Sequence, residues 1–393
     1  MAGLYIHIPF CASRCIYCGF YSTTLTDLQD KYVEAVCREI EIKSINQEIQ
    51  TIYLGGGTPS QLSKENLQKI FNTIHKVYPN TFVANSSSDC EITLECNPDD
   101  VTLEFAQFAA SLGVNRVSMG AQTFNDERLK FLHRRHTSEE VILAVQRLRS
   151  AGIHNISIDL MFGFPNQTLF EWEEDLWMAL SLNPEHISAY SLMYEEGTAL
   201  YRMLETNKVK EIDDELSLAM YNKLIDLLSS AGYEHYEISN FARLNPSFNA
   251  KVSPYRSRHN SSYWHEVPYI GIGAAAHSYN KVSRLWNISD VNKYIELMLS
   301  TELTSIPKEV YEEETLDINT RYDDLITTAL RTREGIDLAK MRKEYGEDLY
   351  KFLIEASKKY IAQGYLKSED DHLAFTREGI YISDAIMSDL MHV

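Results

Sequence analysis

The fold is decided near the N-terminus, by the run Tyr5-Ile6-His7-Ile8-Pro9-Phe10-Cys11-Ala12-Ser13-Arg14-Cys15-Ile16-Tyr17-Cys18. A short apolar stretch that is typical of a strand leads there directly into three cysteines at CxxxCxxC spacing. Three thiolates are one fewer than the four protein ligands that close a structural tetrahedral metal site. An iron–sulfur cube held by three cysteines keeps one iron open to a small molecule, and the spacing favours this kind of site.

A structural zinc site is the competing interpretation of these cysteines. Such sites usually pair two CxxC units far apart in sequence, and the chain contains no second CxxC. His7 would have to supply the fourth ligand, but it lies within the strand at a spacing unlike that of a zinc ribbon. The other three cysteines, Cys37, Cys90 and Cys96, are scattered, so the six do not indicate a disulfide framework.

Apolar runs alternate with helical patterns through the first half of the chain. We expect strands at 4–8, 51–54, 92–95, 116–119, 156–160 and 186–190, with helices between them. Two of those helices begin with capping-box spacing, Thr137 with Glu140 and Thr168 with Glu171. The alternation predicts parallel strands joined by right-handed crossovers. Six units are too few for a closed eight-fold barrel, so the expected α/β fold is a partial, open (β/α)6 barrel.

Polar and glycine residues that could bind a ligand or take part in chemistry follow or end these predicted strands. The cysteine loop follows the first strand, Gly55-Gly56-Gly57-Thr58-Pro59 follows the second, and Glu95, Gln122 and Asp159 follow or end later ones. Ligands of open parallel sheets bind at the carboxyl ends of the strands. The sequence therefore predicts that these residues converge on one site.

The pattern changes after about residue 200, and we expect three domains. Residues 1–200 form the barrel core, residues 201–320 a mixed α+β extension, and residues 321–393 a winged-helix-like C-terminal domain. In the extension, 213–231 is expected to be helical, 245–263 to be a polar loop, and 271–274 to be a tight glycine turn. The C-terminal domain carries more acidic than basic residues, which favours a lid or packing module over a reader of nucleic acid.

Composition and charge restrict the function further. The 393 residues carry a formal net charge of -19, a field that repels phosphate backbones and disfavours a general nucleic-acid binder. No apolar run reaches the length of a transmembrane segment. A strand pattern begins at Leu4, where a targeting peptide would show a different pattern, so we expect a cytoplasmic protein.

The cysteine loop resembles that of the radical S-adenosylmethionine (SAM) superfamily, because an aromatic residue, Tyr17, precedes the third cysteine. The resemblance implies that Cys11, Cys15 and Cys18 bind a [4Fe–4S] cluster, and that S-adenosylmethionine (AdoMet) binds the open iron. The same resemblance implies AdoMet contacts at Tyr5, Tyr17, Gly56, Gly57, Thr58, Glu95, Gln122, Arg134 and Asp159. Amide and carboxylate groups suit ribose hydroxyls, a guanidinium suits a carboxylate, and glycines permit close approach of the main chain.

Further motifs are similar to the oxygen-independent coproporphyrinogen III oxidase family over nearly the whole chain. Coproporphyrinogen dehydrogenases of that family carry a fourth cysteine two places after the third, where this chain has Phe20. The heme chaperone branch, HemW, has phenylalanine there and an HNxxYW motif, which matches residues 259–264. The resemblance thus implies heme-binding roles for His259, Tyr263 and Trp264. Heme iron takes an axial imidazole and aromatic rings offer flat faces, although a histidine beside aromatics is more often structural.

Two functions follow from this resemblance. The first is a heme-binding chaperone that passes heme to an acceptor protein, with the cluster and AdoMet supporting it and flavodoxin or ferredoxin as electron donor. The second is radical decarboxylation of coproporphyrinogen III to protoporphyrinogen IX. Phe20 and the HNxxYW motif favour the first, so we expect radical SAM machinery without coproporphyrinogen III dehydrogenase activity. Radical modification of RNA, a third possibility, is disfavoured by the acidic charge.

Overall fold

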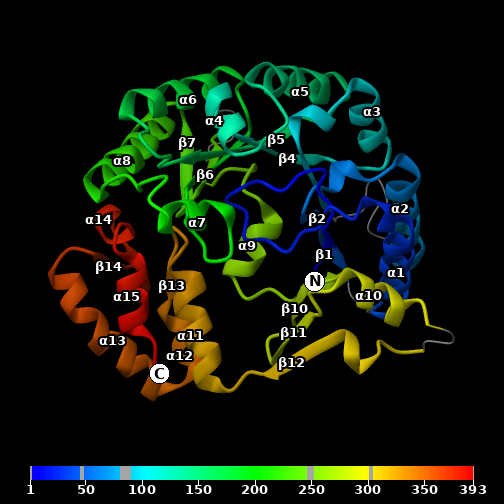
Figure 1. Cartoon of the computed structure of the whole chain (residues 1–393). Coiled ribbons are helices and arrows are strands. Elements are labelled where there is room, and N and C mark those ends of the chain that lie inside the picture. Colours follow the sequence, from blue (N-terminus) through cyan, green and yellow to red (C-terminus); the bar gives the residue numbers. More distant parts are fainter. Residues whose placement is uncertain (1, 45–47, 80–89, 246–251, 301–303, 393) are drawn as a thin grey trace.

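The computed structural model describes residues 2–44, 48–79, 90–245, 252–300 and 304–392. A curved, open sheet of twelve strands lies at its centre, in the order β12-β11-β10-β9-β1-β2-β3-β4-β5-β6-β8-β7 (Figure 1). The middle of this sheet is parallel: β1 (Ala2–Ile8), β2 (Ile49–Gly56), β3 (Glu91–Cys96), β4 (Arg116–Gln122), β5 (Asn155–Phe162) and β6 (His186–Ser191). These six strands confirm the predicted open (β/α)6 barrel.

Helices cover the outer face of the parallel strands, as Figure 1 shows. They are α1 (Gln29–Ile42), α2 (Lys64–Val77), α3 (Leu103–Ser111), α4 (Asp126–Phe131), α5 (Ser138–Ser150) and α6 (Leu169–Ser181). Both predicted capping boxes form, at Thr137 with Glu140 and at Thr168 with Glu171, and fix the starts of α5 and α6. Short 3-10 turns lie at Thr26–Leu28, Pro59–Gln61, Pro98–Asp100 and Lys308–Val310.

Residues 201–320 extend both edges of the sheet. On one edge β8 (Asn240–Arg243) pairs antiparallel with β6, and β7 (Tyr233–Glu237) pairs with β8. On the other edge β9 (Tyr269–Ile272) runs parallel to β1, followed by antiparallel β10 (His277–Tyr279), β11 (Ser283–Asn287) and β12 (Tyr311–Thr315). The accompanying helices are α7 (Ala199–Glu205), α8 (Asp214–Ser230), α9 (Arg258–Trp264) and α10 (Val291–Met298).

The short helix α9 corrects one expectation, because it lies within the segment that was predicted to be a loop. The Ser257 side chain accepts a hydrogen bond from the backbone N–H of Asn260, which caps the first turn. The Glu91 carboxylate, at the start of β3, accepts the N–H groups of Arg258 and His259 at 3.1 and 3.0 Å. A carboxylate 168 positions away in sequence thus stabilises this helix start, and no local pattern signals it. Residues 246–251 of the same segment lie outside the described residues.

The predicted glycine turn at 271–274 is also partly strand. Gly271 lies in β9, and its missing side chain leaves room for the backbone of His277 on the neighbouring strand. The turn itself begins at Gly273, whose φ of +99° is a conformation that other residues rarely adopt.

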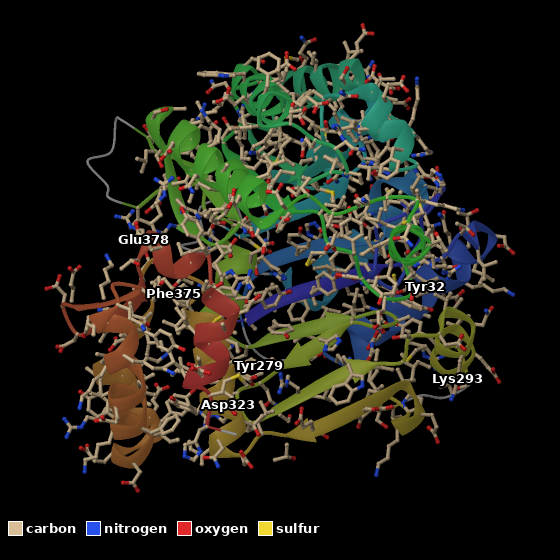
Figure 2. All side chains as sticks on the ribbon, turned by 60° about the vertical axis from the view of Figure 1, so that its left-hand side comes forward. Tyr32, Tyr279, Lys293, Asp323, Phe375 and Glu378 are labelled. Carbon is tan, nitrogen blue, oxygen red and sulfur yellow. The ribbon has the colours of Figure 1, made fainter. Side chains whose placement is uncertain are left out.

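The C-terminal residues pack around a separate apolar core (Figure 2). Its elements are α11 (Ile318–Ala329), β13 (Ile336–Asp337), α12 (Leu338–Tyr345), α13 (Glu347–Ala362), β14 (Leu366–Glu369), β15 (His372–Phe375), α14 (Arg377–Ile380) and α15 (Ser383–Leu390). Three helices precede a hairpin, as the winged-helix-like pattern predicts. Arg377 contacts Asn222 and Asp226 of α8, which ties this part to the barrel. Among the described helices, none combines the length and apolar character needed to cross a membrane.

Candidate cluster and cofactor site

The cysteine loop is closed at its base by backbone hydrogen bonds. Cys11 N donates to Thr23 O at 2.9 Å, and Thr23 N donates to Pro9 O at 2.7 Å. The loop is also fastened to the glycine turn, because Gly57 N donates to Ile8 O at 2.8 Å. Residues 11–22 therefore leave the end of β1 from a fixed position.

A small apolar cluster supports the far side of the same loop. Ile16 is buried against Leu132, Phe164, Leu192 and Leu200. Ile16 N donates to Leu132 O at 3.3 Å, and Leu200 N donates to Ile16 O at 2.9 Å. Because Ile16 lies between Cys15 and Cys18, its burial orients these two cysteines.

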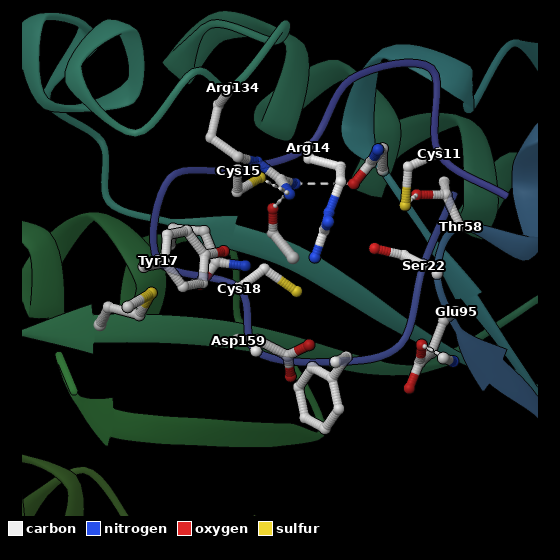
Figure 3. Close-up of a pocket in the computed structure, with 18 of the residues that line it drawn as sticks. Cys11, Arg14, Cys15, Tyr17, Cys18, Ser22, Thr58, Glu95, Arg134 and Asp159 are labelled. Carbon is white, nitrogen blue, oxygen red and sulfur yellow. Dashed lines mark hydrogen bonds between the residues drawn. The ribbon is translucent and has the colours of Figure 1, made fainter. Parts of the chain in front are cut away.

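A cavity of about 550 Å³ opens at the carboxyl ends of the parallel strands. Cys11, Cys15 and Cys18 line it, and Figure 3 shows the sulfur atoms of Cys11 and Cys18 pointing into a space bordered by Asp159. Of the predicted AdoMet residues, the cavity is lined by Tyr17, Gly56, Gly57, Thr58, Glu95, Gln122, Arg134 and Asp159. Tyr5 does not line this cavity. The structure thus brings eleven of the twelve residues predicted for the cluster and AdoMet to one place.

The turn after β2 needs glycine at positions 56 and 57, because the chain that leads to the cysteine loop lies directly against it. A Cβ atom on Gly57 would lie 2.7 Å from Ile8 O and from the carbonyl carbon of Pro9. A Cβ atom on Gly56 would collide with the His7 ring, and Gly56 has a φ of +107°. The two glycines therefore allow β2 to end directly against the chain that leads to Cys11.

Glu95 occupies the end of β3 and faces the cavity. Its Oε1 accepts a hydrogen bond from Tyr53 Oη at 2.7 Å, and its Oε2 accepts the N–H of Gly56 at 3.0 Å. Burial raises the pKa of Glu95 to about 7, although both hydrogen bonds favour the charged form. A bound cation or hydrogen-bond donor would stabilise this carboxylate.

Asp159 lies across the cavity, on β5, among serine hydroxyls. Ser118 Oγ donates to it at 3.2 Å, and the hydroxyls of Ser157 and Ser188 also face it. Burial raises the pKa of Asp159 to about 6, while the positive charge of Arg116 and these hydroxyls lower it. The cavity therefore holds two desolvated carboxylates, and both are suited to accept hydrogen bonds from a ligand.

Gln122 and Arg134 border the cavity above β4. The pairing register of β4 shifts between Gly120 and Gln122, and Gln122 has a φ of +68°, which is uncommon for a residue other than glycine. Such a bulge re-aims a side chain at the end of a strand. Arg134 Nη2 donates to Asn97 Oδ1 at 2.7 Å and to Gly120 O at 2.6 Å, while its buried Nε has no hydrogen-bond partner within the described residues.

The thiols fit a cluster ligand set. Thr58 Oγ1 donates to Cys11 Sγ at 3.4 Å, and Arg134 Nη1 lies 3.6 Å from Cys15 Sγ, so donors already face two of the sulfurs. Burial raises the pKa of the Cys11 and Cys18 thiols, and metal binding would deprotonate them. Within the described residues, no group of three His, Cys, Asp or Glu side chains meets closely enough to hold one metal ion.

A second cavity, of about 640 Å³, adjoins the first. It lies between the cysteine loop, α9, the strands β9 to β11 and α11, and Tyr5, Tyr263 and Trp264 line it. Gly19 and Phe20 line both cavities, and the Phe20 side chain is 72% exposed. The residue that replaces the fourth cysteine therefore stands between the two spaces.

His259 lies beneath these cavities and lines neither. Its Nδ1 is 2.8 Å from Thr51 Oγ1 and its Nε2 is 2.8 Å from Tyr263 Oη, so both ring nitrogens have hydrogen-bond partners. Burial lowers the pKa of His259 to about 3, which keeps the imidazole neutral. In this arrangement His259 positions the Tyr263 ring, and its direct contact with heme stays a prediction.

Comparison with known proteins identifies the family. The radical SAM superfamily model matches residues 5–178, and that of the HemN C-terminal domain matches residues 316–382. The heme chaperone HemW of Bacillus subtilis is 32% identical over 390 residues, 98% of each chain. The heme chaperone HemW of Synechocystis sp. is 36% identical over 304 residues, 75% of this chain and 70% of that one. This chain belongs to the HemW family of the radical SAM superfamily.

A solved structure shares the fold of this HemW-family chain. Coproporphyrinogen III oxidase (HemN) from Escherichia coli superposes with a TM-score of 0.82 at 20% sequence identity, over 100% of this chain and 90% of that one. The match confirms the open radical SAM barrel with its C-terminal extension.

Sequence reasoning missed several polar residues of the HemW-family site. Tyr53 donates a hydrogen bond to Glu95, and the hydroxyls of Ser118 and Ser188 donate to Asp159. All three lie on the strands at positions that face the barrel interior, so alternation along each strand was the signal that could have found them. A buried chain also runs from Ser157 through His186 to Tyr236, with distances of 2.8 Å at each step.

Proposed function

We propose that this protein is a heme chaperone, which holds a [4Fe–4S] cluster and AdoMet in the first cavity and passes heme to an acceptor protein. The observation that carries the proposal is the pair of adjoining cavities, one with three thiols and one with aromatic walls, that meet at Phe20. The names of the relatives from Bacillus subtilis and Synechocystis sp. support the heme part.

Cys11, Cys15 and Cys18 would hold the cluster, whose chemistry when bound is to supply an electron to the sulfonium of AdoMet. The side chains around it suit the charges of AdoMet. Glu95 and Asp159 accept hydrogen bonds from ammonium and hydroxyl groups, and Arg134 donates to a carboxylate. An electron donor of the flavodoxin or ferredoxin kind belongs to the same proposal.

Heme would occupy the second cavity, against the rings of Tyr263 and Trp264. His259 remains the predicted heme-related residue of its motif, acting in this conformation through Tyr263. We also propose the division into residues 1–200, 201–320 and 321–393, and a cytoplasmic location.

The test compares heme binding with decarboxylation in one preparation. Cluster-loaded protein is reduced without oxygen and supplied with AdoMet and coproporphyrinogen III, with HemN from Escherichia coli as the positive control. We expect no protoporphyrinogen IX, and stoichiometric heme binding with a stable Soret band. Formation of protoporphyrinogen IX at a rate comparable with the control would overturn the proposal.

A further inference from the structure

The second cavity is built for a flat ligand. Its volume of about 640 Å³ lies within the range of small-molecule and cofactor sites, roughly 300–1,000 Å³. Its walls are largely aromatic: Tyr5, Tyr21, Tyr263, Trp264, Tyr269, Tyr279 and Trp286. The Tyr263 and Tyr269 rings meet edge to face at 4.6 Å, so this wall is packed before any ligand enters. Preformed aromatic walls favour a planar, largely apolar guest.

Only one histidine that lines this cavity has free ring nitrogens among the described residues. His7 Nδ1 lies 3.0 Å from Tyr5 Oη, and His7 Nε2 lies 3.0 Å from Tyr21 O. His277 lines the cavity from β10, and its ring is stacked with that of Trp286 at a centroid distance of 6.2 Å. Neither nitrogen of the His277 ring has a hydrogen-bond partner in the part of the chain that the structure describes. An imidazole nitrogen without a partner can donate its lone pair to a metal.

One cationic side chain on the wall suits a carboxylate. Arg284 lines the cavity beside the carboxylates of Asp324 and Glu266. Its Nη1 donates to Asp324 Oδ1 at 3.3 Å and its Nη2 lies 3.5 Å from Glu314 Oε2, so some of its five N–H groups remain for a ligand.

We propose that heme binds in this second cavity with His277 as an axial ligand of its iron. Arg284 faces the ligand's carboxylates, and the aromatic walls hold the macrocycle. The inference rests on the proposed heme chaperone function and adds to it the ligating residue, which lies outside the HNxxYW motif. It also places the bound ring against Phe20, two positions after Cys18.

The test titrates heme into cluster-loaded protein without oxygen and records difference spectra. The variants are His277→Ala and, as a matched control, His154→Ala, an exposed histidine at the opposite, N-terminal end of β5. We expect the Soret band of ligated heme to disappear in His277→Ala, with affinity lowered at least about tenfold, and to be unchanged in His154→Ala. Added imidazole should restore the band in His277→Ala, which a purely structural role would not allow.

Free-base protoporphyrin IX separates ligation from cavity filling, because it has no iron. We expect His277→Ala to bind protoporphyrin IX as the wild type does, measured by the same change in porphyrin fluorescence. Equal binding also reports that the variant is folded. An unchanged heme spectrum in His277→Ala, with loss of the band in His259→Ala instead, would overturn the inference and leave the chaperone function standing. A wild-type protein that binds no heme would overturn both the inference and the proposed chaperone function.

Discussion

Replacing Glu95 by Gln should make the metal-free, ligand-free protein more stable at alkaline pH. The Glu95 carboxylate is desolvated, and its pKa rises from 4.5 to about 7 on folding. Between these pH values the native state binds more protons at Glu95 than the unfolded chain does. The stability of the wild type therefore falls as pH rises through this window.

The magnitude follows from the two pKa values. At about 1.4 kcal/mol per pH unit, the difference between them costs the wild type roughly 3 kcal/mol at pH 8 and under roughly 1 kcal/mol at pH 5. Glutamine carries no charge to desolvate. Its carbonyl can accept the N–H of Gly56 while its amide donates to Tyr53, so both existing contacts have a counterpart.

Urea unfolding of the metal-free protein at pH 5 and pH 8 measures this difference. The control is Glu174→Gln on the exposed face of α6, which should follow the wild type at both pH values. We expect Glu95→Gln to gain up to roughly 3 kcal/mol at pH 8 and much less at pH 5. Equal stability of Glu95→Gln and wild type at pH 8 would refute the reasoning, as would a difference independent of pH. The same variant should bind AdoMet more weakly, because it loses the negative charge.

Other substitutions test the packing around the site. Gly57→Ala puts a Cβ atom 2.7 Å from Ile8 O and from the carbonyl carbon of Pro9, so we expect the chain that leads to Cys11 to shift. The iron content of the variant after reconstitution should fall severalfold, and an iron content equal to that of the wild type would contradict this. Trp172→Phe removes the buried hydrogen bond of 2.9 Å from Nε1 to Met220 O and should cost about 1–2 kcal/mol of unfolding free energy in urea titrations, with an unchanged AdoMet affinity.

The first cavity could be predicted because its residues lie at the ends of strands with strong local patterns. The strands of the parallel core carry apolar residues at least at every second position or so, and topology alone brings the ends of such strands together. Cys11, Glu95 and Asp159 therefore converge even though more than a hundred positions separate the first from the last.

The second cavity could not be predicted in the same way, because it depends on pairing between distant segments. β9 joins the edge of β1, with Tyr5 opposite Gly271, and Tyr5 lines the second cavity, which β9 to β11 help to form, rather than the first. The start of α9 depends on Glu91, far away in sequence. Neither partner is visible from periodicity or capping signals near the segment itself.

The central claim is that three cysteines hold a cluster whose open iron binds AdoMet. Electron paramagnetic resonance of the reduced, anaerobically reconstituted protein, recorded with and without AdoMet, tests it most directly. We predict a [4Fe–4S] signal that changes shape when AdoMet is added, that is lost in Cys15→Ala and that persists in Cys37→Ala, whose cysteine is buried in α1. A signal indifferent to AdoMet, or a protein that takes up zinc in place of the cluster, would contradict the claim.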